Sequence, residues 1–113
     1  MYKITFSKTA LNDIDNIINY IFYKLNNRIA ALNLLNSFVS SKKYIIVFSK
    51  ANKFNEKYYK FRIKNYYMFY TLDEVTKTIT IVRVLYRKRN FQELLDLESM
   101  PKKEKNQDIS WSF

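Results

Sequence analysis

Cysteine, histidine and glycine are all missing from this sequence of 113 residues. Without cysteine there is no disulfide, thiolate metal ligand or thiol nucleophile, and without histidine the Ser-His-Asp triad and histidine-based zinc sites are excluded. The lack of glycine excludes phosphate loops built on that residue and leaves asparagine as the expected residue at left-handed turn positions. Any catalysis must therefore use lysine, arginine, tyrosine or carboxylate side chains, and we expect no cofactor and no metal.

Long apolar runs are missing as well. The opening residues, MYKITFSKT, contain no apolar run typical of a signal peptide. No stretch of the sequence is long and apolar enough to cross a bilayer. We therefore expect a cytoplasmic protein with no membrane partner. The length fits one domain, and the ten tyrosines and nine phenylalanines predict a core rich in packed rings.

Positive charge is what the sequence has in excess, with a formal net charge of +10. Between Lys50 and Arg89, eleven lysines and arginines face three acidic residues. Such a block favours nucleic acid or an acidic protein as a partner, and a solubilising surface is the ordinary alternative. Four of the five arginines lie at positions 62, 83, 87 and 89. Because the guanidinium fork binds phosphate or carboxylate bidentately, this clustering predicts an oxyanion site.

The first half of the sequence predicts a strand and two helices. Residues 2–6 alternate as an edge strand does. Ser7 can then cap a helix whose apolar residues recur at helical spacing, and Asn26 and Asn27 end it. Apolar spacing stays helical over residues 28–48, so we expect one long helix there, although KYIIVF alone would favour a strand.

The second half predicts a three-stranded antiparallel meander and a short last helix. YKFRI, YYMFYTL and TITIVRVLY have a period of two, and Lys64 and Asn65 form the first tight turn, with asparagine in place of glycine. NFQELLDL closes as a helix. The expected fold class is therefore α+β: an N-terminal strand, a two-helix hairpin, the meander and a short C-terminal helix, with the helices on one sheet face.

The alternation along the strands separates apolar from basic side chains. If the helices cover the face of Tyr59, Phe61 and Ile63, the other face stays open. That open face is expected to carry side chains from several strands, namely Lys60, Arg62, Tyr67 and Arg83, with Arg87 just past the last strand.

Together these segments resemble the RelE/ParE family of bacterial toxins from type II toxin–antitoxin systems. The matching segments are SKTALNDIDNIINYI, YYKFRIKNYYMFY with the acidic turn after it, and ITIVRVLYRKRNF before a leucine-rich turn. The resemblance covers residues 1–97 as a toxin domain and leaves 98–113 as a polar C-terminal tail. It implies the fold described above and a growth-inhibiting toxin neutralised by a cognate acidic antitoxin.

The family resemblance implies two different activities. RelE-like members cleave mRNA on the ribosome without metal, by attack of a ribose 2′-OH on the next phosphate. ParE-like members bind DNA gyrase and are not hydrolytic. By position, Lys60 and Arg62 match the basic pair of the RelE-like hairpin strand and Arg87 the basic residue after the last strand. Arg83 and Arg89 match the R-V-L-(H/Y)-x-x-R signature, common in ParE-like and unclassified members.

The chemistry of mRNA cleavage assigns roles to these residues. Lys60, beside Arg62, would act as the base, and Arg87 would hold the phosphate. Tyr67 or Tyr86 would stack a nucleobase or bind the target. Two departures from the family patterns weaken this assignment. Tyr67 replaces a RelE-like arginine of the second hairpin strand. In the R-V-L signature, Tyr86 replaces the histidine often found after R-V-L and Asn90 replaces the aspartate after the last arginine.

Three functions therefore stay open at the level of sequence, and the first is favoured because three cations on one face suit a phosphate better than a protein surface. The three functions are ribosome-dependent mRNA cleavage, inhibition of DNA gyrase without catalysis, and binding of RNA or protein without toxicity. The ordinary interpretation of Arg83 and Arg89 is a salt bridge with Glu93, Asp96 or an antitoxin carboxylate.

Overall fold

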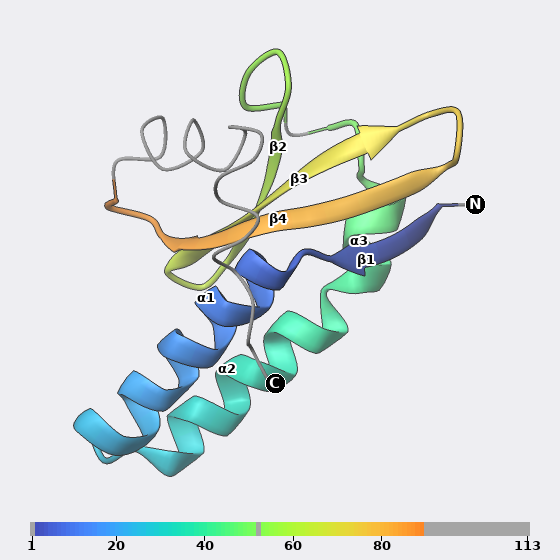
Figure 1. Cartoon of the computed structure of the whole chain (residues 1–113). Coiled ribbons are helices and arrows are strands. Elements are labelled where there is room, and N and C mark those ends of the chain that lie inside the picture. Colours follow the sequence, from blue (N-terminus) through green and yellow to red (C-terminus); the bar gives the residue numbers. More distant parts are fainter. Residues whose placement is uncertain (1, 52, 90–113) are drawn as a thin grey trace.

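The computed structural model describes residues 2–51 and 53–89 (Figure 1). The expected order of strand, two-helix hairpin and three-stranded meander is confirmed, whereas the last helix and the tail at 98–113 lie outside the described residues. The elements are β1 (Lys3–Phe6), α1 (Lys8–Asn19), a π-helical turn (Tyr20–Lys24), α2 (Arg28–Ser40), α3 (Lys42–Val47), β2 (Tyr59–Ile63), β3 (Tyr66–Asp73) and β4 (Thr78–Tyr86).

Polar side chains cap both long helices, as their sequence positions suggest. The Oγ of Ser7 accepts from the N–H of Ala10 at 3.0 Å and also donates to the carbonyl of Val82 at 3.1 Å. Asn27 caps α2 by accepting from the N–H of Ala30 at 3.0 Å. Ser7 therefore satisfies an otherwise unpaired helix N–H and fixes the start of α1 against β4.

The expected single helix over residues 28–48 is broken at Ser41 into α2 and α3. Ser41 is buried, and its Oγ donates to the carbonyl of Phe38 at 2.7 Å. A hydroxyl bonded back to the preceding turn competes with the helical ladder and bends the helix. The strand alternative for KYIIVF is wrong, because Lys42–Val47 form the helix α3. Ile45 of this helix is fully buried in the core.

The sheet has the strand order β1-β4-β3-β2, with β1 parallel to β4 and the other pairs antiparallel. The edge position expected for the first strand is confirmed. In Figure 1 the helices α1 and α2 lie on one side of this sheet. The core between these layers combines helix residues with one face of the meander, and its fully buried members include Phe38, Met68, Tyr70, Ile79 and Ile81.

Two irregularities of the meander differ from expectation. The register shifts between Phe69 and Tyr70, so that Phe69 pairs with Arg83 while Tyr70 pairs with Ile81. Such a β-bulge places one extra residue in β4 and re-aims the neighbouring side chains. At the β2–β3 turn it is Lys64, with φ 53°, that takes the left-handed conformation expected for an asparagine.

Candidate functional site

Lys60 of β2 lies on the sheet face opposite the helices and is held by two aromatic rings. It pairs with Phe69 across the β2–β3 ladder. Its Nζ lies 4.5 Å from the ring centroid of Tyr67 and 5.1 Å from that of Phe54. Ring faces attract a cation electrostatically. The two rings therefore hold the ammonium group at this position.

The face that carries Lys60 is less open than the sequence suggested. Tyr58, Phe69 and Leu85 form a second buried cluster there, with Phe54, Tyr67 and Val82 packed against it. Tyr67 belongs to this packing, and its ring centroid lies 6.1 Å from that of Phe69. Phe69 and Leu85 lie at period-two positions of their strands, and this alternation is the sequence pattern that could have predicted the second cluster.

Arg62 and Arg87 each contact a residue of the β2–β3 turn. The Nε of Arg62 donates to the carbonyl of Lys64 at 2.7 Å. The backbone N–H of Arg87 donates to the carbonyl of Asn65 at 2.9 Å, and its Nε lies 3.4 Å from the Asn65 Oδ1. Both arginines are exposed. The structure thus brings two of the predicted cations to one turn, at the end of the strand that carries Lys60.

Arg83 lies against α1 rather than on the open face where it was expected. Its Nε and Nη2 donate to the two carboxylate oxygens of Asp13 at 2.8 and 2.9 Å. The same carboxylate accepts from the N–H of Val84 at 2.9 Å. The bidentate bond to the Asp13 carboxylate is the physical reason, and Arg83 lies at the β-bulge, where the register of β4 shifts. Its partner is Asp13, whereas Glu93 and Asp96 lie outside the described residues.

The Asp13–Arg83 pair is largely buried, with 11% and 15% of the two side chains exposed. Burial raises the pKa of the Asp13 carboxyl above its usual value of 3.8, and Arg83 opposes this effect. The desolvation penalty of a buried ion pair can exceed the attraction between its two charges. The pair therefore fixes where β4 meets α1. The positive charge of Arg83 is balanced by the Asp13 carboxylate within the fold.

Tyr86 points to the helix-covered side of the sheet. It pairs with Tyr66 in the β3–β4 register, and the two ring centroids lie 5.8 Å apart in an edge-to-face arrangement. Both rings and Tyr20 line an open cavity of 510 Å³ beside α1. Arg89 lines an adjoining pocket of 140 Å³ with Asp13 and Tyr86. Tyr86 and Arg89 are thus separated from Lys60 by the thickness of the sheet.

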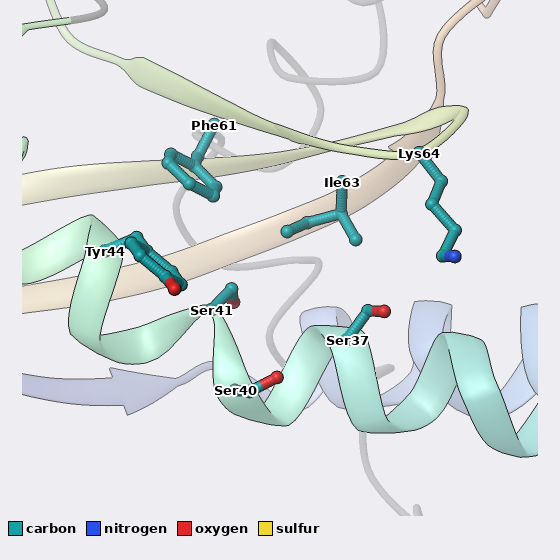
Figure 2. A pocket seen from close by; sticks show the side chains of 7 residues that line it. All are labelled: Ser37, Ser40, Ser41, Tyr44, Phe61, Ile63 and Lys64. Carbon is teal, nitrogen blue, oxygen red and sulfur yellow. The ribbon is translucent and has the colours of Figure 1, made fainter.

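A further pocket of 290 Å³ lies between the helices and β2 (Figure 2). Sequence reasoning missed it. Ser37, Ser40 and Ser41 recur at helical spacing on one side of α2, which was the available signal. The residues that line the pocket are Ser37, Ser40, Ser41, Tyr44, Phe61, Ile63 and Lys64.

The described residues bear on metal and membrane binding as well. Within residues 2–51 and 53–89, no group of three or more histidine, cysteine or acidic side chains is arranged to hold a metal ion. No helix in the same ranges is long and apolar enough to span a bilayer.

Comparison with known proteins matches residues 4–91 to a family described as the ParE toxin of type II toxin–antitoxin system, parDE. Curated proteins give no match. Among solved structures, the chromosomal ParDE system of P. aeruginosa has a TM-score of 0.64 at 16% identity, over 76% of this chain and 96% of that chain. The isolated E. coli RelE toxin has a TM-score of 0.52 at 15% identity, over 86% and 98% of the two chains. At these identities the two structures establish the shared fold.

Proposed function

Because the chain belongs to the ParE toxin family of type II toxin–antitoxin systems, we propose that it arrests growth by binding DNA gyrase, without cleaving nucleic acid. Its partner in the same system is a cognate antitoxin. The observation that carries the choice of gyrase is the environment of Lys60. A general base would have to give up the positive charge that the rings of Phe54 and Tyr67 attract.

The other candidate residues also fit binding better than proton transfer. Cleavage by general acid–base catalysis needs a base and an acid within hydrogen-bond reach of one phosphate. Tyr86 lies on the far side of the sheet from Lys60, and Arg83 is neutralised by Asp13. Exposed Arg62 and Arg87 at the β2–β3 turn remain as cations for an acidic surface on a protein target.

Ribosome-dependent mRNA cleavage is the second candidate, and one observation favours it. Arg62 of β2 and Arg87, the residue after β4, both contact the same turn. Two guanidinium groups so placed fit a phosphate whose negative charge grows in the transition state. In that mechanism Lys60 is the base and the two arginines hold the scissile phosphate.

Expression of the toxin in growing cells separates the two mechanisms. We expect DNA synthesis to stop before protein synthesis, and the purified protein to block supercoiling by gyrase while mRNA on programmed ribosomes stays intact. Codon-phased cuts in ribosome-bound mRNA would overturn the gyrase assignment.

A charge-conserving variant, Arg87→Lys, sharpens the test. If Arg87 holds a reacting phosphate, loss of its bidentate fork lowers cleavage about a hundredfold while ribosome binding changes little. If Arg87 contacts gyrase, the variant changes gyrase affinity, and neither protein cuts mRNA. The double variant Lys60→Ala and Arg62→Ala should abolish toxicity in either case while the thermal transition is retained. Continued growth arrest by that variant would show that the target binds elsewhere.

A further inference from the structure

The helix α2 presents an apolar stripe to the outside of the molecule. Ile29, Leu32 and Val39 are 71%, 52% and 57% exposed, whereas Ala31 and Phe38 on the inner side of the same helix are buried. A helix with apolar residues on both its inner and its outer side is normally covered on both sides. The outer side of α2 therefore lacks a covering partner in the part of the chain that the structure describes.

The stripe has the spacing of a helix–helix seam. Its members follow one another at intervals of three, four and three residues, namely Ile29, Leu32, Asn36 and Val39. This is the a-d-a-d order of a heptad repeat, and it places the four side chains within about 80° of arc on the helix surface. A β-branched residue at an a position and leucine at a d position favour two parallel helices. α2 thus carries the side chains of a two-stranded contact.

Asn36 lies within this stripe and determines which partner fits. It is exposed. An amide that enters an apolar seam loses its hydrogen bonds to water and must regain them from the partner. A parallel copy of the same helix places a second Asn36 opposite the first, where the amide N–H of one can donate to the amide oxygen of the other. An antiparallel copy with the stripes fully overlapped would instead place Asn36 opposite Leu32.

The lack of charge on α2 favours a second copy of this chain over an acidic partner. From Ile29 to Ser41 no residue is charged, although the whole chain carries a formal net charge of +10. An acidic segment would gain no electrostatic attraction from this face. Two copies of a strongly basic protein repel each other, and this repulsion is weakest where they meet through an uncharged surface.

We propose that two copies of this chain associate through α2 as a short parallel helix pair, with Asn36 of each copy hydrogen-bonded to Asn36 of the other. The stripe from Ile29 to Val39 spans about 15 Å. Because the fold already holds α2 as a helix, association does not require helix nucleation. An interface of this size predicts a dissociation constant on the order of 10–100 µM. The contact leaves the sheet face of Lys60 accessible in both copies, since that face is opposite the helices.

Sedimentation equilibrium of the full-length toxin tests the association. We expect a monomer–dimer equilibrium whose dissociation constant falls at least threefold between about 0.05 and 0.5 M salt, because salt screens the repulsion between two basic copies. Association with an acidic antitoxin should show the opposite salt dependence. A chain that stays monomeric at about 500 µM, well above the expected dissociation constant, would contradict the proposal.

A matched pair of variants locates the contact. Val39→Glu places a carboxylate on the stripe, whereas Val75→Glu places the same charge in the turn between β3 and β4, where Val75 is 91% exposed. Both variants change the net charge of the chain equally, and glutamate is favourable in a helix. We expect Val39→Glu to raise the dissociation constant of the dimer at least tenfold and Val75→Glu to change it less than about twofold. Equal dimerisation by the two folded variants would show that α2 is not the interface.

Disulfide trapping tests the parallel register. Since the chain has no cysteine, Leu32→Cys introduces a single thiol. In the parallel pair the thiols of the two copies lie opposite each other, where a disulfide can form. With oxidised glutathione as the oxidant, we expect Leu32→Cys to form a covalent dimer at least tenfold faster than the control variant Val75→Cys. Equal rates would exclude the parallel contact.

The antitoxin is the alternative occupant of the stripe, and the same thiol distinguishes it from a second copy. The probe is the small acidic protein encoded next to this chain, added to Leu32→Cys before alkylation with iodoacetamide. A toxin that is monomeric alone, and whose thiol is protected only when the acidic protein is bound, would assign the stripe to the antitoxin and overturn the self-association. Protection that increases with toxin concentration in the absence of the acidic protein is the result expected here.

Discussion

Asp13 holds α1 against β4 through hydrogen bonds to two residues of that strand. Its carboxylate accepts from Arg83 and from the N–H of Val84. Asp13→Ala leaves a guanidinium largely buried without its counter-charge, and such a loss typically costs about 3–5 kcal/mol of unfolding free energy. Urea denaturation measures it. Asp15→Ala on the same helix is the control and should cost less than about 1 kcal/mol.

The titration of Asp13 follows from its burial. Because burial raises its pKa above 3.8 despite Arg83, ionisation of Asp13 reduces the stability of the fold. The stability that the protonated carboxyl of Asp13 contributes is fully present below pH 3.8, and it is lost as the pH rises through the raised pKa. Carboxyl carbon NMR should therefore give an Asp13 pKa above 3.8, and a still higher one in Arg83→Met. A value below 3.8 in the wild type would contradict this account.

At the scale of an element, the β2–β3 hairpin tolerates an unfavourable turn residue. Lys64 has φ 53°, a conformation that costs a non-glycine residue about 1 kcal/mol. Lys64→Gly removes this strain, whereas Lys64→Ala keeps it, and both remove the same charge. We expect the glycine variant to be about 0.5–1 kcal/mol more stable than the alanine variant in urea denaturation, after allowance for the higher entropy of unfolded glycine. Equal stabilities would show that the turn holds no strain.

At the scale of the whole molecule, the net charge of +10 predicts the kinetics of antitoxin binding. Opposite charges steer two proteins together, and salt screens this attraction. We expect the association rate constant to fall at least tenfold between about 0.05 and 0.5 M salt, with a smaller change in the dissociation rate. Stopped-flow fluorescence measures both, with sucrose as an uncharged control. A rate constant independent of salt would contradict electrostatic steering.

The sequence by itself determined the features that depend on neighbouring residues. Helical spacing and the side chains of Ser7 and Asn27 predicted where α1 and α2 begin, because capping is a local hydrogen bond. Alternation along the meander predicted that Phe61 and Ile63 face the helices while Lys60 does not, since strand geometry has a period of two. These local rules were sufficient for the α+β order and for the family resemblance.

Only the tertiary structure decided the features that join distant segments. Asp13 and Arg83 are 70 residues apart, and their contact lies at a bulge in β4 that no local pattern indicated. The rings of Phe54 and Tyr67 meet at Lys60 only because the loop before β2 packs on the sheet face opposite the helices. Long-range packing thus paired Arg83 with Asp13 inside the fold and placed the ammonium group of Lys60 between two rings, because burial and proximity, rather than residue type alone, set what a charged side chain can do.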